Sequence, residues 1–322
     1  MSSITRITVE EHPKLILLLG SGLIGSAIER ELGPYLDQQQ YSVSVNWLPT
    51  MRKTLRKAYQ ELERVTAKTF DDTKLVPSIH IIWAAGTAGF SSSKDKTNEE
   101  LEYFIECLAT TSDLAKTMLC GPINFHLVSS AGGIFEGQRF INEDSLPSPR
   151  RPYGHLKYTE EQQLLCYQET INSYIYRLSS VYGLIQPRQR RGLISTLVEN
   201  SLTGRSTFIS GSMNTLRDFV WLPDVARFIV KQVEIEIPPS GPFFLGSGKS
   251  ATIESIKRRV EFYLRRRIYC QYQLPATNSA DISISSRVLP SDWAPTHIET
   301  NIFRVLSDYR LFHGRRLLHE SI

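Results

Sequence analysis

A tyrosine and a lysine stand four residues apart in the segment Tyr153-Gly-His-Leu-Lys157. On a helix this spacing puts both side chains on one face, a single turn apart. A free phenol has a pKa of about 10 and is a weak base at neutral pH, but a nearby ammonium group stabilises its ionised form. The pair could therefore take a proton from a substrate hydroxyl and return it. A helix that simply faces solvent would also fit this short pattern.

Two serines precede this pair, at the end of an expected strand. Residues 124–128 predict a buried strand, and Ser129-Ser130-Ala131-Gly132-Gly133 follows it. Small residues leave space for a ligand, and a serine hydroxyl can donate a hydrogen bond to a substrate oxygen. A serine- and glycine-rich loop without chemistry is the alternative, and the neighbouring motifs favour the catalytic interpretation.

The glycine motif Gly20-x-Gly22-x-x-Gly25 lies between the apolar run 14–19 and the helical pattern 26–32. A strand, a glycine turn and a helix in this order are typical of dinucleotide binding, because the helix N-terminus offers N–H groups and a partial positive charge to phosphates. Gly20 permits the tight turn, Gly22 lets a pyrophosphate approach the backbone, and Gly25 lets helix and strand pack closely. The residues expected to bind the phosphates are Gly20, Gly22, Leu23, Ile24 and Gly25.

The stretch expected to hold the adenosine ribose lacks an acidic residue. The second strand of such a fold commonly ends in a carboxylate, but residues 43–47 contain none, and Arg52, Lys53 and Arg56 follow. A carboxylate repels a 2′-phosphate, whereas a cation attracts it. The sequence therefore favours NADP over NAD, with Asn46 and Arg52 among the cofactor-binding residues. The alternative is that these cations form the solvated face of a helix.

Short apolar runs alternate with helical patterns through the first 183 residues. This alternation indicates βαβ units and a parallel sheet that is covered on both faces. We predict an α/β fold in which residues 1–183, with part of 215–235 returning, form a Rossmann-like, doubly wound parallel sheet that binds the dinucleotide. Residues 184–322, where glycine and proline separate shorter elements, are expected to form mainly a smaller α/β lobe that binds substrate.

The composition excludes several classes of protein. With 322 residues, 41% of them hydrophobic and 22% charged, the chain is an ordinary globular mixture and not collagen-like, coiled-coil or wholly disordered. A net charge of +4 gives no reason to expect a nucleic-acid or membrane surface. The cysteines and histidines lack disulfide-framework and metal-ligand spacing, so we predict neither kind of site. No signal peptide or spanning segment is recognisable, and we expect a cytoplasmic protein.

Together these features resemble the extended short-chain dehydrogenase/reductase family, in its NAD-dependent epimerase/dehydratase group that modifies nucleotide sugars. The resemblance covers nearly the whole chain and is specific because several short motifs occur in a fixed order. The motifs are Gly20-Ser-Gly-Leu-Ile-Gly25, Ala84-Ala-Gly86, Ser129-Ser130, Tyr153-x-x-x-Lys157, Arg177-Leu-Ser-Ser-Val-Tyr-Gly183 and Arg217-Asp-Phe-Val-Trp-Leu-Pro-Asp224-Val-Ala226.

The resemblance implies a role for each motif. Tyr153 would be the catalytic acid/base, and Lys157 would assist it and hold the nicotinamide ribose. In many relatives the catalytic hydroxyl falls at the position of Ala131, so Ser130 is our choice here and Ser129 the alternative. The residues implied to line the cofactor are Ala84, Ala85 and Gly86, besides Tyr153 and Lys157. The implied substrate contacts are Ser129, Ser130, Ser180 and Arg217, of which the arginine would meet a diphosphate.

The resemblance implies hydride transfer at a sugar carbon of a nucleoside-diphosphate sugar, at C4, by an epimerase or by an NADPH-dependent ketoreductase. Gly132 and Gly133 stand where 4,6-dehydratases carry an Asp-Glu pair, so elimination would lack its acid and base. A dinucleotide-binding sensor or scaffold without catalysis is the alternative, favoured by the altered serine turn and by Ser180. The resemblance also implies a homodimer through helices at 99–118 and 155–170, and a setting in polysaccharide biosynthesis.

Overall fold

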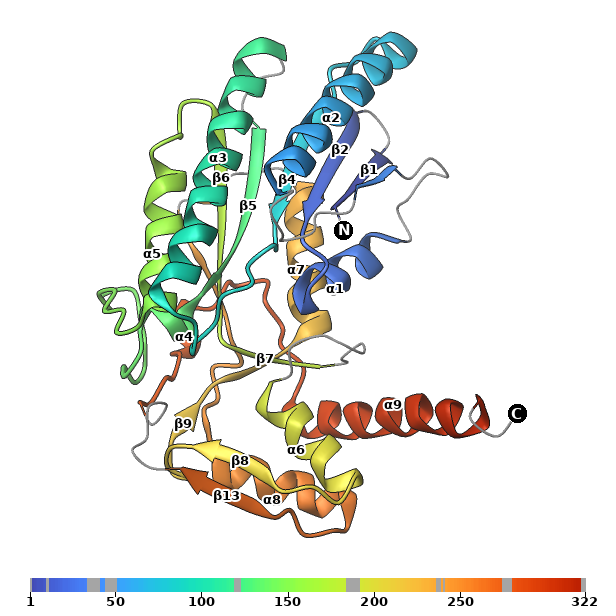
Figure 1. Cartoon of the computed structure of the whole chain (residues 1–322). Coiled ribbons are helices and arrows are strands. Elements are labelled where there is room, and N and C mark those ends of the chain that lie inside the picture. Colours follow the sequence, from blue (N-terminus) through green and yellow to red (C-terminus); the bar gives the residue numbers. More distant parts are fainter. Residues whose placement is uncertain are drawn as a thin grey trace. The chain divides into compact units, whose positions relative to one another are not determined.

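The computed structural model divides the chain into two compact units (Figure 1). It describes residues 2–9, 12–33, 41–43, 51–118, 123–183, 192–235, 239, 241–273 and 280–319. Unit 1 comprises residues 1–134, 147–177 and 226–243, and unit 2 comprises residues 135–146, 178–225 and 244–322. The chain therefore passes from one unit to the other five times.

The main sheet is built on three strands that pair in parallel, β2 (His12–Leu19), β4 (Ser78–Trp83) and β5 (Ile123–Ser130). Every residue of β5 is buried, although half of them are polar, because both faces of this strand are covered. Four further strands complete the sheet, which has the order β11-β6-β5-β4-β2-β1-β3. These are β1 (Ser2–Val9), β3 (Tyr41–Val43), β6 (Ile171–Leu178) and β11 (Phe243–Leu245).

One face of this sheet packs against α2 (Met51–Thr73), α3 (Lys94–Met118) and α5 (Pro152–Leu165). Alternate strand residues point to this face, and they form one core with apolar residues of the helices. In α2 the buried residues recur three or four positions apart, so the helix turns one continuous stripe toward the sheet. Members of this core include Leu17, Ile81, Phe125, Leu62 and Phe104.

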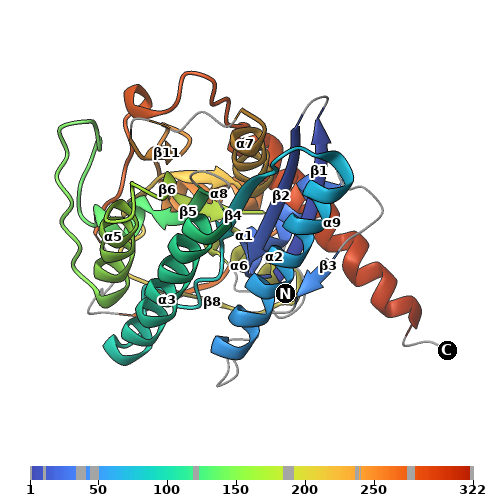
Figure 2. The ribbon, with the colours of Figure 1, turned by 90° about the horizontal axis from the view of Figure 1, so that it is seen from above.

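The opposite face carries α1 (Leu23–Leu32) and α7 (Leu222–Ile235), as Figure 2 shows for α7. The buried ammonium group of Lys14 on β2 donates to the carbonyl oxygens of Val233 and Glu234 at 3.1 and 2.8 Å. These carbonyls belong to the last turn of α7, where the helix dipole favours a cation. This bond attaches α7 to the strand that leads into the glycine turn.

Beneath α7 the sheet carries a chain of polar side chains. His80 Nδ1 lies 3.0 Å from His126 Nε2, and His126 Nδ1 lies 2.8 Å from the Tyr176 hydroxyl. Burial, and then the neighbouring His80, hold the pKa of His126 well below its usual range, so the ring stays neutral. The Phe228 ring of α7 packs edge-on against Tyr176, with 6.4 Å between ring centroids. The helix thus keeps water from these groups.

The strand β1 was not expected from the sequence. It pairs antiparallel with β2 along its whole length, from Ser2 with Leu19 to Val9 with His12, and also with β3. Its apolar residues do not alternate regularly. However, β-branched residues dominate residues 4–9, and this composition could have indicated a strand. Because β1 lies between β2 and β3, those two strands are not neighbours in the sheet.

Unit 2 is made of short strand pairs and helices around its own apolar core. Parallel pairs join β7 with β10 and β8 with β13, and an antiparallel pair joins β9 with β12. The strands are β7 (Ser180–Tyr182), β8 (Thr207–Ser210), β9 (Leu216–Arg217), β10 (Phe219–Trp221), β12 (Ala251–Thr252) and β13 (Cys270–Gln273). The helices are α6 (Leu193–Leu202), α8 (Ile253–Leu264), α9 (Ile298–His319) and the 3₁₀ helix η2 (Ser286–Val288).

The predicted fold class is confirmed, since the protein is α/β with a parallel central sheet covered by helices on both faces. Within the described ranges, none of the helices combines the length and apolar character that a membrane crossing requires. The same residues contain no group of three or more His, Cys, Asp or Glu side chains arranged to hold a metal ion.

Candidate active site

The glycine turn joins the end of β2 to the start of α1. Gly20 has a φ of +111°, a conformation that side chains rarely adopt. A Cβ on Gly20 would lie 2.4 Å from the Ala84 carbonyl oxygen, and one on Gly25 would lie 2.0 Å from the Gly20 carbonyl oxygen. Only glycine therefore lets the turn, the helix and the loop after β4 approach so closely. At Gly22, by contrast, a Cβ would meet no atom within 4 Å.

The start of α1 has the chemistry of an anion site. Gly22 is its N-cap and has no side chain to bond the first N–H groups, and the first turn holds no acidic residue. The helix dipole adds a partial positive charge there. Open space at Gly22, together with half-buried Leu23 and Ile24, gives a cradle that fits the diphosphate of a dinucleotide.

The predicted adenosine-binding residues are only partly represented. Asn46 lies outside the described residues, and of Arg52 only the backbone, in the first turn of α2, is described. In a doubly wound fold the ribose partner stands at the end of the strand next to β2. Here that neighbour is β1, and β3 is one strand further away. The preference for NADP stays a prediction.

Lys157 is a buried cation held between two buried carboxyl groups. Its Nζ donates to Glu160 Oε2 at 2.8 Å and to Glu100 Oε1 at 3.2 Å. Glu160 lies one turn further along α5, and Glu100 reaches in from α3. The other oxygen of Glu100 accepts the backbone N–H groups of Thr87 and Ala88 at 2.8 and 2.7 Å. Glu100 therefore links the lysine to the loop that follows β4.

Gly86, in that loop, lies directly over the ion pair. A Cβ at this exposed residue would be 3.0 Å from Glu100 Oε1 and 3.1 Å from Lys157 Nζ. The predicted cofactor-lining segment of Ala84, Ala85 and Gly86 follows β4 at the carboxyl edge of the sheet. The ammonium group thus lies just below a bare stretch of backbone, where a bound ribose could approach it.

Burial and charge set the ionisation of this cluster. Burial alone would lower the pKa of Lys157, but the charges of Glu160 and Glu100 outweigh it and hold the pKa above its usual value. Burial raises the pKa of Glu160 to about 7, against the opposing effect of Lys157. Lys157 therefore stays protonated, while Glu160 changes its charge near neutral pH.

Glu160 by itself is expected to lower the free energy of unfolding as the pH rises from about 4.5 to about 7, whereas the neutral ring of His126 acts in the opposite direction, so the comparison of wild type with a Glu160 variant isolates the effect. In this window the native protein keeps a proton on Glu160 that the unfolded chain has lost, so raising the pH favours unfolding, by at most about 3 kcal/mol. Urea unfolding of the wild type and of Glu160→Gln across these pH values measures the slope. The variant should lose this part of it, and equal slopes would show that Glu160 is ionised throughout.

Tyr153 stands at the start of α5, half-buried, one turn before Lys157. The lysine Nζ lies 6.0 Å from the centroid of the phenol ring. A Cβ on Gly133 would lie 3.1 Å from that ring, and a Cβ on Gly154 would lie 2.2 Å from the Gly133 carbonyl oxygen. Two glycines thus let α5 meet α4 (Ala131–Ile134) closely enough to bring the tyrosine against the end of β5.

The two serines at the end of β5 have different environments. Ser129 Oγ donates to Glu161 Oε1 at 2.6 Å, and Arg177 also donates to Glu161, from Nη2 to Oε2 at 2.7 Å. Ser130 Oγ instead accepts the N–H of Gly133 at 3.1 Å. Strand residues alternate between faces, so these adjacent hydroxyls point to opposite sides. The Ser129 hydroxyl donates its hydrogen bond to the buried ion pair of Glu161 and Arg177. Ser130 lies at Gly133, beside Tyr153.

Two predicted substrate contacts belong to unit 2. Ser180 begins β7, and its N–H donates to the Asp218 carbonyl oxygen at 3.1 Å. The guanidinium group of Arg217 is buried and donates to the carbonyl oxygens of Leu216 and Ala280. Arg217 is thus built into this unit, and its contact with a substrate diphosphate stays a prediction.

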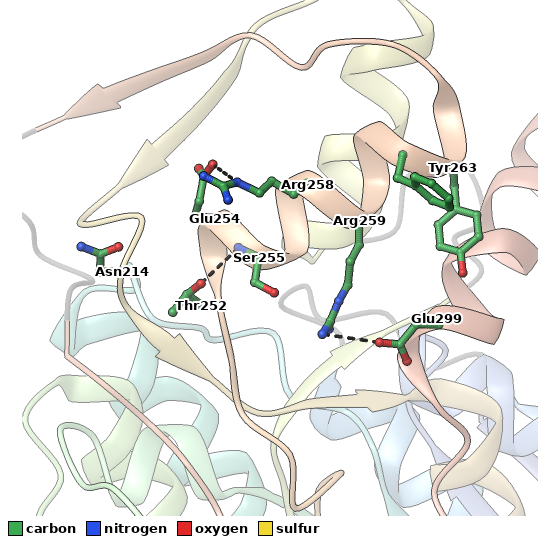
Figure 3. A pocket seen from close by; sticks show the side chains of 9 residues that line it. Asn214, Thr252, Glu254, Ser255, Arg258, Arg259, Tyr263 and Glu299 are labelled. Carbon is green, nitrogen blue, oxygen red and sulfur yellow. Dashed lines mark hydrogen bonds and ion pairs between the residues drawn. The ribbon is translucent and has the colours of Figure 1, made fainter.

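A pocket of about 510 Å³ also lies in unit 2, at the start of α8 (Figure 3). Its cations are paired, Arg258 with Glu254 at 2.8 Å and Arg259 with Glu299 at 3.4 Å. None of the predicted site residues lines it. The lining residues are Asn214, Thr252, Glu254, Ser255, Arg258, Arg259, Phe262, Tyr263 and Glu299.

Sequence reasoning missed the carboxylates around the lysine. Glu160 stands three residues after Lys157, a helical spacing at which side chains meet, and this signal was available. Glu100 lies 57 residues before Lys157 on another helix, and no local pattern connects them. Glu161 is similarly joined to Arg177 by tertiary contact, although both belong to recognisable segments.

Comparison with known proteins identifies the family. The sequence profile of the family described as "NAD dependent epimerase/dehydratase family" matches residues 16–240. The chain is 35% identical over 104 residues to the putative UDP-glucose 4-epimerase of Methanocaldococcus jannaschii and 25% identical over 178 residues to the dTDP-4-dehydro-6-deoxyglucose reductase of Escherichia coli. The matches cover 31% and 53% of this chain, and the chain spans 34% and 56% of the length of these relatives.

Solved structures show the same fold. The UDP-glucose 4-epimerase of Thermus thermophilus, in complex with NAD, superposes with a TM-score of 0.67 at 19% identity, over 90% of this chain and 97% of that one. MoeE5, in complex with UDP-glucuronic acid and NAD, gives a TM-score of 0.69 at 20% identity, over 90% and 96% of the two chains. Since the family profile spans β2 to α7, more than half of the protein, the chain belongs to the NAD-dependent epimerase/dehydratase family.

Proposed function

We propose that the protein transfers hydride between C4 of a nucleoside-diphosphate sugar and a nicotinamide dinucleotide. The observation that carries this proposal is that the side chains of Ser130 and Tyr153 both lie beside Gly133. The N–H of Gly133 donates to Ser130 Oγ, and a Cβ on Gly133 would lie 3.1 Å from the Tyr153 ring. Lys157 lies one turn from Tyr153, beneath Gly86. An acid/base and a donor to the same substrate oxygen are thus available together.

In the proposed mechanism Tyr153 takes the proton of the C4 hydroxyl, and the Ser130 hydroxyl donates a hydrogen bond to the same oxygen. The ammonium group of Lys157 has three N–H bonds, of which two point to carboxylates, so one is left for a ribose hydroxyl. The glycine turn holds the diphosphate, and Ala84, Ala85 and Gly86 line the nicotinamide end. A bound nicotinamide would supply the hydride acceptor for oxidation at C4, or the hydride donor for reduction there.

Two outcomes fit this chemistry. In an epimerase the hydride would return to the other face of the keto sugar. In a ketoreductase a keto sugar would be reduced once at the expense of NADPH, and in both cases Tyr153 would give the oxygen its proton. The relatives named above are a 4-epimerase and a reductase of a 4-dehydro sugar, and both names refer to carbon 4. We propose NADP as the preferred dinucleotide, because residues 43–47 contain no acidic residue and cations follow them.

Absorbance of the reduced nicotinamide, followed with UDP- and dTDP-sugars and their 4-keto forms, is expected to reveal the activity. A reductase consumes NADPH in proportion to keto sugar, and an epimerase interconverts C4 epimers with no net consumption. Titration with both dinucleotides tests the cofactor, and a clear preference for NAD would contradict the NADP prediction. A purified protein that binds neither dinucleotide would contradict the proposed function as a whole.

A dinucleotide-binding sensor or scaffold is the second candidate. The observation that favours it is that Lys157 forms ion pairs with two carboxyl groups. These contacts compete with the contacts that a catalytic lysine makes with its substrate and cofactor. Dinucleotide bound without turnover of any sugar, together with a stable protein partner, would support this candidate over the enzyme.

The homodimer stays a prediction. Ile105 on α3 and Leu165 on α5 are exposed apolar residues, 36% and 45% accessible, on the two helices expected at the interface. Such residues suit a helix-packed contact between two copies. The mass of the protein in solution, measured by light scattering, would contradict the prediction if it were that of one chain.

A further inference from the structure

Glu160 is a buried carboxyl group with one oxygen left over. Its side chain is 0% exposed, and its Oε2 accepts the short bond from Lys157 at 2.8 Å. Oε1 is buried and has no hydrogen-bond partner among the described residues. A buried carboxylate oxygen without a donor is costly, whereas a proton on it removes the charge. The geometry therefore marks Oε1 as the place where this cluster can hold a proton.

Glu100, the other carboxyl group of the cluster, is fully engaged. One of its oxygens accepts from Lys157, and the other accepts from the backbone N–H groups of Thr87 and Ala88. Lys157 and Glu100 are one cation and one carboxylate in contact, so a second carboxylate at Glu160 gives these three groups a net charge of −1.

We propose that Glu160 is a positioning residue for Lys157, and that the proton on its Oε1 decides how strongly the ammonium group acts on the Tyr153 phenol; this inference rests on the acid/base role given to Tyr153 in the proposed function. With the proton present, the cluster is neutral and Lys157 stabilises a phenolate. When the proton leaves to solvent, a carboxylate offsets the ammonium charge, and the phenol keeps its own proton more tightly.

Three charged groups act on Glu160, namely Lys157, Glu100 and Glu161. From α3 it faces Glu100, and on its own helix it faces Lys157 and Glu161. The carboxylate of Glu161 is bonded by Arg177 of β6 and by Ser129, so its charge is balanced on the other side of the helix. Burial is the main cause that raises the pKa of Glu160 to about 7, which places the change of charge near neutral pH.

The proposal can be tested without substrate or dinucleotide, by NMR of protein labelled with ¹³C at the glutamate carboxyl and tyrosine hydroxyl-bearing carbons. The signals are assigned with Glu160→Gln and Tyr153→Phe. We expect one glutamate to titrate with a midpoint of about pH 7 and to vanish in Glu160→Gln. In the same variant, the pH at which Tyr153 ionises should fall by about one unit, because a neighbouring negative charge is gone.

The control is Glu99→Gln, which removes an exposed carboxylate from the adjacent position on α3 and should leave both titrations unchanged. The proposal is overturned if every glutamate of the wild type titrates below about pH 5.5, a result that needs no variant to fold. It is also overturned if Glu160→Gln leaves the Tyr153 titration where it was. Neither readout uses sugar turnover, so failure of the proposed function would show separately, as an absence of hydride transfer.

Discussion

Tyr153→Phe is expected to lower the rate of hydride transfer by about 10³-fold, the usual loss when a positioned acid/base group is removed. The substitution deletes only the hydroxyl group. The ring, which packs against Gly133 and lies 5.5 Å from the Phe90 ring centroid, stays in place. We therefore expect the fold and the dinucleotide affinity to survive. Single-turnover absorbance of the nicotinamide measures the rate, and fluorescence titration measures the affinity.

The matched control is Tyr158→Phe, which removes a phenol hydroxyl from the same helix, α5, at a residue outside the proposed site. This variant should keep its turnover. If Tyr153→Phe transfers hydride at the wild-type rate, Tyr153 is not the base. If it also loses the dinucleotide, the hydroxyl serves binding instead of proton transfer.

Two substitutions in the glycine turn are expected to differ in effect. Gly25→Ala should lower both the stability of the protein and its dinucleotide affinity, whereas Gly22→Ala should lower mainly the affinity. At Gly25 the new Cβ would lie 2.0 Å from the backbone oxygen of Gly20, so α1 must move away from the turn. We expect a loss of about 3 kcal/mol in the free energy of unfolding, typical of severe backbone overlap, together with loss of dinucleotide binding. Chemical denaturation and calorimetric titration measure the two effects.

Gly22→Ala is the matched partner, because a Cβ there meets nothing within 4 Å in the protein and the residue has a φ of −69°. Its stability should change by at most about 1 kcal/mol, the scale of an altered N-cap. Its dinucleotide affinity should nevertheless fall by about tenfold, since the methyl group takes the space that a diphosphate needs. Wild-type affinity in this variant would place the diphosphate elsewhere.

Several elements of unit 1 were predictable because their own residues show a strand or helix pattern. The strands β2, β4 and β5 are followed by small residues, as expected, whereas the helix with Tyr153 and Lys157 spans Pro152–Leu165 and not the expected 155–170. The glycine turn was predictable for the same reason, since its three positions obey local steric limits. Patterns of this kind report burial and spacing along the chain, and they located the candidate site.

The partners of the buried polar groups were not predictable in the same way. Periodicity shows that a residue is inside, but it does not show which distant residue meets it there. Glu100 and Lys157 are 57 residues apart, and only the packing of α3 on α5 joins them. The difference between Ser129 and Ser130 was within reach, because strand alternation sends adjacent residues to opposite faces. The strand β1 was missed because its apolar residues do not alternate.

The return of residues 226–243 to unit 1 has a consequence for biosynthesis. A ribosome releases the strands and the glycine turn early, but α7, which shields Tyr176 through Phe228 and receives Lys14 at its end, emerges much later. Until then, α1 is already present on this face of the sheet, but the part that α7 covers, which includes Tyr176, has no helix over it. The first unit therefore has all its residues only after residue 243 has been made, and we expect a fragment that ends near residue 183 to expose the part of the sheet under α7 and to aggregate.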